Sequence, residues 1–243
     1  MKILAFDTAT SSCSAAVWQD GKIVAYRHKT MARGHAEHLM GMVSDVLKEA
    51  GVGFPDLNLL AVTNGPGGFT GLRVGLAAAR GISFAGDLAC IGVSTLEVVA
   101  NCVSFAERDG ALVLAAIDTK REDIYAQVFT NVLVGSGLHP LGKSEAILPK
   151  NLANFLCIRG SSQSNLIDKI VVIGDATVRA IAALRDSGID SVAGTATFAC
   201  DARGVAKLAA TRSIVETSAE SLRPLYLRPP DATIPRNGGR LRP

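Results

Sequence analysis

Short apolar runs bounded by polar residues make up the first part of the chain. Residues 2–6 form the first run, and we predict a buried strand there. Two more strands are predicted at 14–18 and 22–28, because Asp20 and Gly21 between them both tolerate the positive φ angles of a tight hairpin turn. The chain is therefore expected to open with three strands, the first two joined by a loop rich in Thr and Ser.

The spacing of apolar residues then changes to that of a helix. Over residues 33–50 they recur at three- and four-residue intervals, and Gly51 marks the end of the predicted helix. A buried strand at 59–63 leads into a glycine-rich loop, after which Thr70 is placed to cap a second helix that reaches roughly Phe84. Further elements are predicted at 89–93 (strand), 94–104 (helix), 111–118, 124–130 and 169–173 (strands), 177–186 (helix) and from Asp201 to about Thr217 (helix).

An apolar strand that ends in an acidic residue occurs in both halves of the chain. The first such strand ends at Asp7 and the second at Asp118. We therefore predict an internal repeat of two similar lobes, each beginning with a strand that carries an Asp to its C-terminal end. The predicted N-terminal lobe spans 1–106 and is completed by the C-terminal helix at about 202–218, and the predicted C-terminal lobe spans 107–201.

The composition fits a compact soluble protein. Of the 243 residues, 48% are apolar and 19% are charged. No apolar run approaches the roughly 20 residues of a membrane span, and the run at the N-terminus is too short for a signal peptide. The five cysteines are widely spaced and include no Cys-x-x-Cys pair, a pattern that favours reduced thiols over a disulfide framework or a zinc site. We therefore expect a cytoplasmic protein.

Positive charge is concentrated at the C-terminal end. The net charge of +3 is too small to predict nucleic-acid binding by itself. Residues 228–243 are mostly Pro, Arg and Gly with little apolar content, so we expect them to form a flexible tail. Contact of this region with the phosphates of a nucleic acid is the alternative to a solvated tail. From position 223 onward the chain carries one acid, Asp231, against five arginines, which are Arg223, Arg228, Arg236, Arg240 and Arg242.

Loops that follow predicted strands carry the residue types of a phosphate site. Ligands of open α/β sheets gather at the carboxyl ends of strands, where an Asp can hold Mg²⁺ and glycines let backbone N–H groups approach an anion. The alternatives are that the first loop only caps a turn, and that the glycines permit two backbone segments to pass closely. No Gly-Lys-Ser/Thr follows, so the glycine-rich loop is not a Walker A sequence. The candidate residues are Asp7, Thr8, Gly65, Gly67, Gly68 and Asp118.

Two histidines, His35 and His38, lie three residues apart on the first predicted helix. A pair with this spacing can share a metal ion, but metalloprotease helices use a four-residue spacing with a Glu next to the first His. No third ligand is evident. We therefore favour partly exposed or partner-facing histidines, and we predict neither a metal site nor a catalytic residue.

Four segments of the chain resemble the bacterial TsaB family, also called YeaZ. They are 3–10 (ILAFDTAT), 34–39 (GHAEHL), 65–75 (GPGGFTGLRVG) and the closing segment 224–232 (PLYLRPPDA). The resemblance implies an α/β fold of the actin, hexokinase and sugar-kinase superfamily (ASKHA), with two lobes that each contain a mixed β-sheet flanked by helices. It also implies a non-catalytic scaffold beside TsaD, the subunit that transfers threonylcarbamoyl to adenosine 37 of tRNA, next to the anticodon.

The resemblance further implies what the protein binds. TsaE would join the larger complex, ATP or ADP with Mg²⁺ would enter only through that complex, tRNA would be contacted indirectly, and the lone chain would form a homodimer. TsaD binds metal through a His-x-x-x-His pattern, and the spacing from His35 to His38 is one residue shorter. TsaD also has paired glycines in its adenosine loop, where this chain has Asp175. The alternatives are a small-molecule kinase or ATPase, and a glycoprotease-like metallopeptidase that the histidine spacing disfavours.

In this family, two N-lobe helices form a helical bundle with the equivalent helices of TsaD or of a second TsaB copy. Carried onto this chain, those are the helices near 33–50 and 70–85. Apolar residues are expected to be buried at the contact and to supply most of the affinity, with His and Arg at its rim. The predicted interface residues are His35, His38, Leu39, Met42, Val46, Leu72, Arg73, Leu76 and Arg80.

Overall fold

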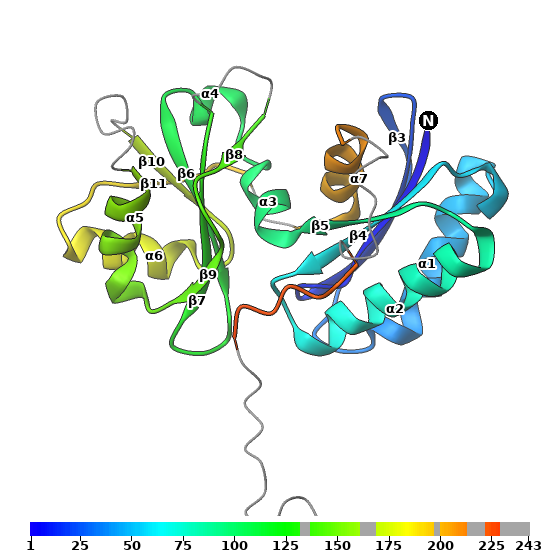
Figure 1. The fold of residues 1–243 in the computed structure, drawn as a ribbon, viewed down its shortest axis with the longest axis horizontal. Coiled ribbons are helices and arrows are strands. Elements are labelled where there is room, and N and C mark those ends of the chain that lie inside the picture. The colour runs from blue at the N-terminus through cyan, green and yellow to red at the C-terminus, as the bar shows by residue number, and fades with distance from the viewer. Residues whose placement is uncertain (132–136, 161–168, 197–199, 213–221, 229–243) are drawn as a thin grey trace, which may run out of the picture.

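The chain folds into two α/β lobes joined side by side (Figure 1). The computed structural model describes residues 1–131, 137–160, 169–196, 200–212 and 222–228. Each lobe is built on one mixed β-sheet, and helices cover the faces of both sheets. Among the described residues, no helix combines the length and the apolar character that crossing a bilayer requires.

The N-terminal sheet has the strand order β3-β2-β1-β4-β5. Strands β1, β2 and β3 are antiparallel neighbours, whereas β4 and β5 run parallel to β1. The hairpin turn between β2 and β3 places Asp20 at φ 45° and Gly21 at φ 93°, as the Asp-Gly pair predicts. The strands are β1 (Lys2–Asp7), β2 (Ser12–Gln19), β3 (Lys22–Thr30), β4 (Leu59–Gly65) and β5 (Cys90–Ser94).

Helices cover both faces of this sheet (Figure 1). Helices α1 (His35–Ala50) and α2 (Phe69–Gly86) lie on one face, and their apolar residues share a cluster with Leu4 and Phe6 of β1. On the other face, α3 (Thr95–Ala100) and α7 (Ala202–Ala210) pack with Ile3 and Ala5. Since successive side chains of a strand point to opposite faces, β1 is buried on both sides, and its continuous apolar sequence follows from that.

The C-terminal sheet repeats the topology of the first. Its order is β8-β7-β6-β10-β11, with β6–β7–β8 antiparallel and β10 and β11 parallel to β6. Strand β6 is thus the counterpart of β1, and the predicted internal repeat is confirmed. The elements are β6 (Ala111–Asp118), β7 (Ile124–Thr130), β8 (His139–Pro140), β9 (Glu145–Ile147), β10 (Lys169–Ile173) and β11 (Val192–Ala193), with α5 (Leu152–Gly160) and α6 (Thr177–Asp186).

Several predicted helices have different ends in the structure. The helix expected at 94–104 ends at Ala100, and α4 (Phe105–Arg108) begins separately after Ser104, whose hydroxyl accepts from the Glu107 N–H. Helix α2 begins at Phe69, just before Thr70. Asp201 caps α7 as predicted, by accepting from the N–H groups of Arg203 and Gly204, but α7 ends at Ala210. The segments 213–217 and 229–243 lie outside the described residues.

The middle of the chain was the least predictable part. Strands β8 and β9 and helix α5 were not foreseen, because these segments are short and lack a clear apolar period. Short one-turn helices also occur at Phe54–Asp56 and Pro149–Asn151. None of these elements changes the order of the long strands, so the predicted two-lobed α/β class with helix-flanked mixed sheets is correct.

Candidate functional site

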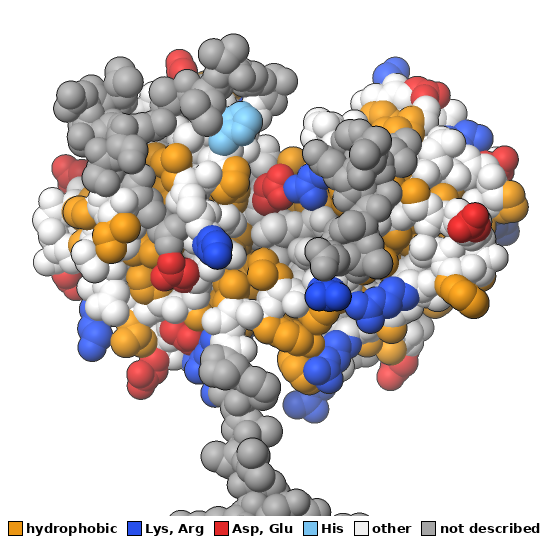
Figure 2. All heavy atoms as spheres, in the orientation of Figure 1, with side chains coloured by type: hydrophobic (Ala, Val, Ile, Leu, Met, Phe, Trp, Pro, Cys, Tyr) orange, Lys and Arg blue, Asp and Glu red, His pale blue; other side chains and the backbone are white. Residues whose placement is uncertain are grey.

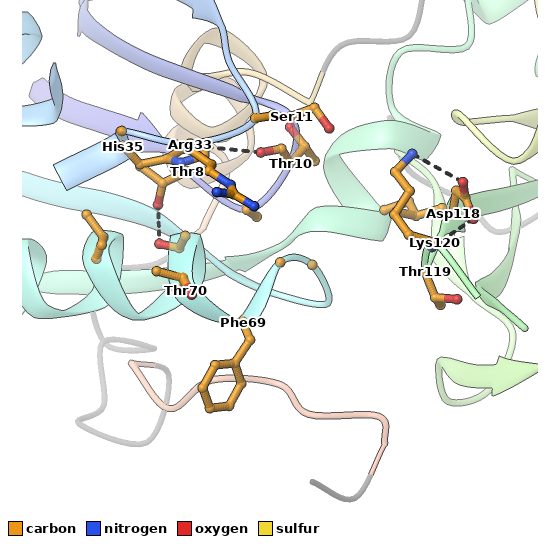
Figure 3. Close-up of a pocket in the computed structure, with 18 of the residues that line it drawn as sticks. Thr8, Thr10, Ser11, Arg33, His35, Phe69, Thr70, Asp118, Thr119 and Lys120 are labelled. Carbon is orange, nitrogen blue, oxygen red and sulfur yellow. Dashed lines mark hydrogen bonds and ion pairs between the residues drawn. The ribbon is translucent and has the colours of Figure 1, made fainter. Parts of the chain in front are cut away.

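A cleft of about 740 Å³ lies between the two lobes. The N-terminal lobe lines it with the loop after β1, the start of α1 and the start of α2. The C-terminal lobe contributes the end of β6 and the residues that follow it. In Figure 3, Thr10 and Arg33 lie on one side and Asp118 and Lys120 on the other, with Phe69 below them. Hydroxyls, two cations and the three carboxylates of Glu37, Asp118 and Asp175 therefore line one open space.

Asp7 does not line this cleft. Its side chain is fully buried at the end of β1, where Oδ1 accepts from the Thr63 hydroxyl at 2.6 Å and from the Ala9 N–H at 3.1 Å. Burial raises the pKa of Asp7 to about 6, because a charged carboxylate is disfavoured away from water, although these hydrogen bonds act in the opposite direction. The first predicted carboxylate thus ties β1 to β4 and does not face the solvent of the cleft.

The glycine-rich loop packs tightly against the loop that follows β1. The N–H of Gly68 donates to the carbonyl of Ala9 at 2.7 Å, and the Thr8 hydroxyl donates to the carbonyl of Gly71 at 2.8 Å. A Cβ added to Gly67 would lie 2.3 Å from the Ala9 carbonyl oxygen, which is closer than any real Cβ contact. These glycines therefore serve the close passage of two backbone segments, one of the two alternatives that the sequence left open.

Asp118 lines the cleft, but its carboxylate is already engaged. Arg179 lies 2.8 Å from Oδ1 and Lys120 lies 3.1 Å from Oδ2. Partial burial acts to raise the pKa of Asp118, but the hydrogen bonds and charges of Lys120 and Arg179 outweigh it and hold the pKa below its ordinary value. The neighbouring Asp175 accepts from the Asp118 N–H at 2.6 Å. A cation arriving here would have to displace two protein cations.

The residues predicted for a nucleotide site are therefore divided by the structure. Thr8, Gly67, Gly68 and Asp118 line the cleft. Asp7 and Gly65 are buried behind it, and a Cβ on Gly65 would approach the Leu225 carbonyl oxygen to 3.0 Å. The sequence did not reveal this division, because a strand end specifies where an Asp lies along the chain and not which neighbours surround it.

Both histidines of α1 have partners within the chain. His35 Nε2 lies 3.2 Å from the carbonyl oxygen of Thr10, and His38 Nε2 lies 3.0 Å from Lys29 Nζ. Across the residues that the structure describes, no group of three or more His, Cys, Asp or Glu side chains is placed to hold a metal ion.

The predicted interface residues require a correction. Leu39, Val46, Leu72 and Leu76 are at most 3% exposed, and the first two and Leu76 pack in the apolar cluster against the sheet of their own lobe. They are core residues and not contact residues. The sequence could not distinguish the two cases, since an apolar stripe at helical spacing fits a sheet and a partner equally well. Of the others, Met42 is partly buried against the same core, and Arg73 and Arg80 are exposed.

The outward faces of α1 and α2 carry a different set of residues. Met40 is 47% exposed and Phe84 is 93% exposed, which is unusual for side chains of this size. A Cβ added to Gly41 or to Gly81 would meet no atom within 4 Å, so another backbone can approach closely there. Figure 2 shows basic and apolar side chains side by side where α2 reaches the surface.

The duplicated lobes and the cleft between them define a two-lobed α/β protein with one mixed sheet in each lobe. YeaZ from Pseudomonas aeruginosa superposes with a TM-score of 0.71 at 25% identity, over 93% of this chain and 99% of that chain. A second solved structure with similarity to that protein gives 0.72 at 26% identity, over 93% and 99% of the two chains.

The sequence comparisons agree with this fold and assign the chain to a family. Residues 28–235 match the family model described as "TsaD: tRNA N6-adenosine threonylcarbamoyltransferase". The tRNA threonylcarbamoyladenosine biosynthesis protein TsaB of Escherichia coli (strain K12) is 41% identical over 125 residues, and that of Haemophilus influenzae is 34% identical over 125 residues. These matches cover 51% of this chain, and the chain spans about half the length of both relatives, 53% and 52%. The chain therefore belongs to this TsaD-type family and, within it, to the TsaB (YeaZ) group.

Proposed function

We propose that this protein is a non-catalytic subunit of the machinery that forms threonylcarbamoyladenosine at position 37 of tRNA. The observation that carries the proposal is the state of the two strand-end carboxylates. Asp7 is buried behind the cleft, and Asp118 is paired with Arg179 and Lys120. Neither is free to hold Mg²⁺ in the way that a kinase of this class requires. The assignment to threonylcarbamoyladenosine formation is supported by the names of the TsaB relatives.

The partner would be TsaD, with TsaE in the larger complex. The match to the TsaD family model supports a likeness between the two chains, and related surfaces can pack together with approximate two-fold symmetry. We place the contact on the outward faces of α1 and α2, around Met40, Gly41, Gly81 and Phe84, because large apolar groups and bare glycines lie exposed there. The same face would form a homodimer when the chain is alone. ATP or ADP would then act in the complex, which would work in the cytoplasm and contact tRNA mainly through TsaD.

A small-molecule kinase or ATPase is the second candidate. The cleft favours it, because about 740 Å³ is enough for a nucleotide and Thr8, Gly67 and Gly68 line it. The engaged carboxylates argue against it. For a metallopeptidase, the described residues offer no cluster of ligands.

Complex formation tests the proposed function. Light scattering after size exclusion is expected to give a stable heterodimer when the chain is mixed with TsaD from the same organism. Phe84→Glu is expected to weaken that complex by at least tenfold in Kd, because it puts a charge into an apolar contact and leaves the core untouched. Val178→Glu is the matched control, since Val178 is 83% exposed on α6 of the other lobe.

Two outcomes contradict the proposal. If no complex forms at micromolar concentration, with or without nucleotide, the scaffold function is wrong and the kinase or ATPase becomes the favoured hypothesis. If Val178→Glu weakens the complex and Phe84→Glu does not, the partner lies on the C-terminal lobe and the placement on α1 and α2 is wrong.

A further inference from the structure

The last described segment of the chain, Leu222–Arg228, crosses from one lobe to the other. We call it the C-terminal strap. In Figure 1 it is the red segment that runs from beside β4 to the lower end of the C-terminal lobe. Its first residue, Leu222, is buried in the apolar cluster formed by β1, α1 and α2, so the strap begins inside the N-terminal lobe.

The N-terminal lobe holds the strap by its backbone. The carbonyl of Leu222 accepts from an Arg80 guanidinium N–H at 2.9 Å, and the Leu225 N–H donates to the carbonyl of Asn64 at 2.7 Å. Glycine is favoured at position 65, because its φ of 114° lies in the region that L side chains rarely adopt and a Cβ there would crowd the Leu225 carbonyl oxygen at 3.0 Å. The glycine-rich motif is thus shaped in part by the strap.

Side chains add a second attachment at the mouth of the cleft. The Tyr226 ring stacks on the Phe69 ring with 5.6 Å between their centroids, and the Tyr226 hydroxyl accepts from Arg73 Nε at 2.9 Å. The Arg73 guanidinium lies 3.7 Å from the centroid of the Phe69 ring. Phe69 itself lines the cleft, so the strap borders that space (Figure 3).

The C-terminal lobe holds the other end. Arg228 lies 3.1 Å from Oδ1 of Asp123, whose side chain is only 14% exposed. Asp123 belongs to the turn between β6 and β7, where its carboxylate and its carbonyl both accept from the Thr119 hydroxyl. Asp118, Thr119 and Lys120 of the same turn form one wall of the cleft. The strap therefore joins α2 to that wall.

The lobes are joined differently on the opposite side. There, α3 and α7 share one apolar cluster with strands of both sheets, including Ile3 and Ala5 of β1 and Val113 and Ala115 of β6. A shared, closely packed core of this kind holds the two lobes together along this side. The strap adds a second connection between the lobes at the edge where the cleft opens.

We infer that the C-terminal strap connects the two lobes and so limits how far the interlobe cleft opens. The Arg228–Asp123 ion pair is the contact that attaches the strap to the C-terminal lobe. Through Arg73 and Arg80, the strap also links the position of α2 to the Asp118–Asp123 turn. A ligand or protein that binds Arg73 or Arg80 in place of the strap would break these contacts and increase the mobility of that turn. This inference concerns the chain by itself and does not rest on the proposed function.

Hydrogen exchange on the full chain tests this inference. In Arg228→Glu, two carboxylates face each other, and we expect the amides of 118–124 and 222–228 to exchange about two- to fivefold faster, the size typical of one partly exposed ion pair. Asp123→Arg should act similarly. Combining the two changes restores an opposite-charge pair and should bring exchange of 222–228 back toward the wild type. Amides of β1 and β2 serve as the internal control.

Unchanged exchange in both single variants would overturn the inference, as would a double variant no closer to the wild type than either single one. If the charge variants do not fold, Tyr226→Phe provides an independent test, because it keeps the stacked ring and removes only the acceptor for Arg73. Faster exchange at 222–228 alone would then mean that the strap is held without being coupled to the turn, which also overturns the proposal. Faster exchange at both segments supports it.

Discussion

At the scale of single residues, Asp7 is a carboxyl group that the fold removes completely from water. Burial raises its pKa from near 4 to about 6, so between these pH values the folded chain holds a proton that the unfolded chain has released. The stabilising contribution of this proton is therefore present at low pH and is lost as the pH rises through about 6. A charged, fully buried Asp7 then destabilises the fold by on the order of 2 to 3 kcal/mol.

Asp7→Asn tests this sign. The amide keeps an acceptor for the Thr63 hydroxyl and the Ala9 N–H but carries no charge. Near pH 7.5 we expect the variant to be more stable than the wild type by about 1 to 2 kcal/mol, with the difference shrinking toward zero near pH 4. Denaturant titrations at several pH values measure this, with Asp45→Asn on the exposed face of α1 as the control. A difference that does not vary with pH would show that Asp7 is not protonated in the folded chain.

At the scale of elements, α2 has two faces with opposite requirements. Gly71 lies on the inner face, where a Cβ would come within 2.0 Å of the Thr8 carbonyl oxygen. Gly81 lies on the outer face, where a Cβ would meet nothing within 4 Å. The same chemical change on one helix should therefore have opposite effects at the two positions.

We predict that Gly71→Ala destabilises the fold by about 1 to 3 kcal/mol, because the helix or the β1–β2 loop must move to make room. Gly81→Ala is expected to stabilise it by up to about 1 kcal/mol through helix propensity alone. Thermal and denaturant unfolding of both variants give the comparison. Equal effects at the two sites would mean that the close contact between α2 and the loop after β1 is not maintained in solution.

The same two faces explain why the interface prediction was wrong in its details. Leu39, Val46 and Leu76 recur at the spacing of an apolar stripe, and that stripe covers the sheet. The contact face that we propose is instead marked by large apolar side chains on the outside, an almost fully exposed Phe84 and a half-exposed Met40. A stripe reveals the buried side of a helix and says nothing about what buries the other side.

At the scale of the whole molecule, two similar lobes enclose a cleft, while the acids at the ends of β1 and β6 are engaged by other groups of the chain. We therefore predict that the isolated chain hydrolyses no ATP above the background rate, and that Asp118→Asn leaves this unchanged. A phosphate-release assay measures both. Turnover in the wild type that disappears in Asp118→Asn would restore the kinase or ATPase alternative.

The sequence by itself determined the order of the long elements, the Asp20–Gly21 hairpin, the repeat of a strand that ends in Asp, and the family. These are local features, because turn chemistry and apolar period act over a few residues. Only the tertiary structure decided that Asp7 is buried, that Asp118 pairs with Arg179, and that Leu222–Arg228 crosses between lobes. The partners in these contacts lie tens of residues or more apart, and chain spacing does not specify which distant groups meet.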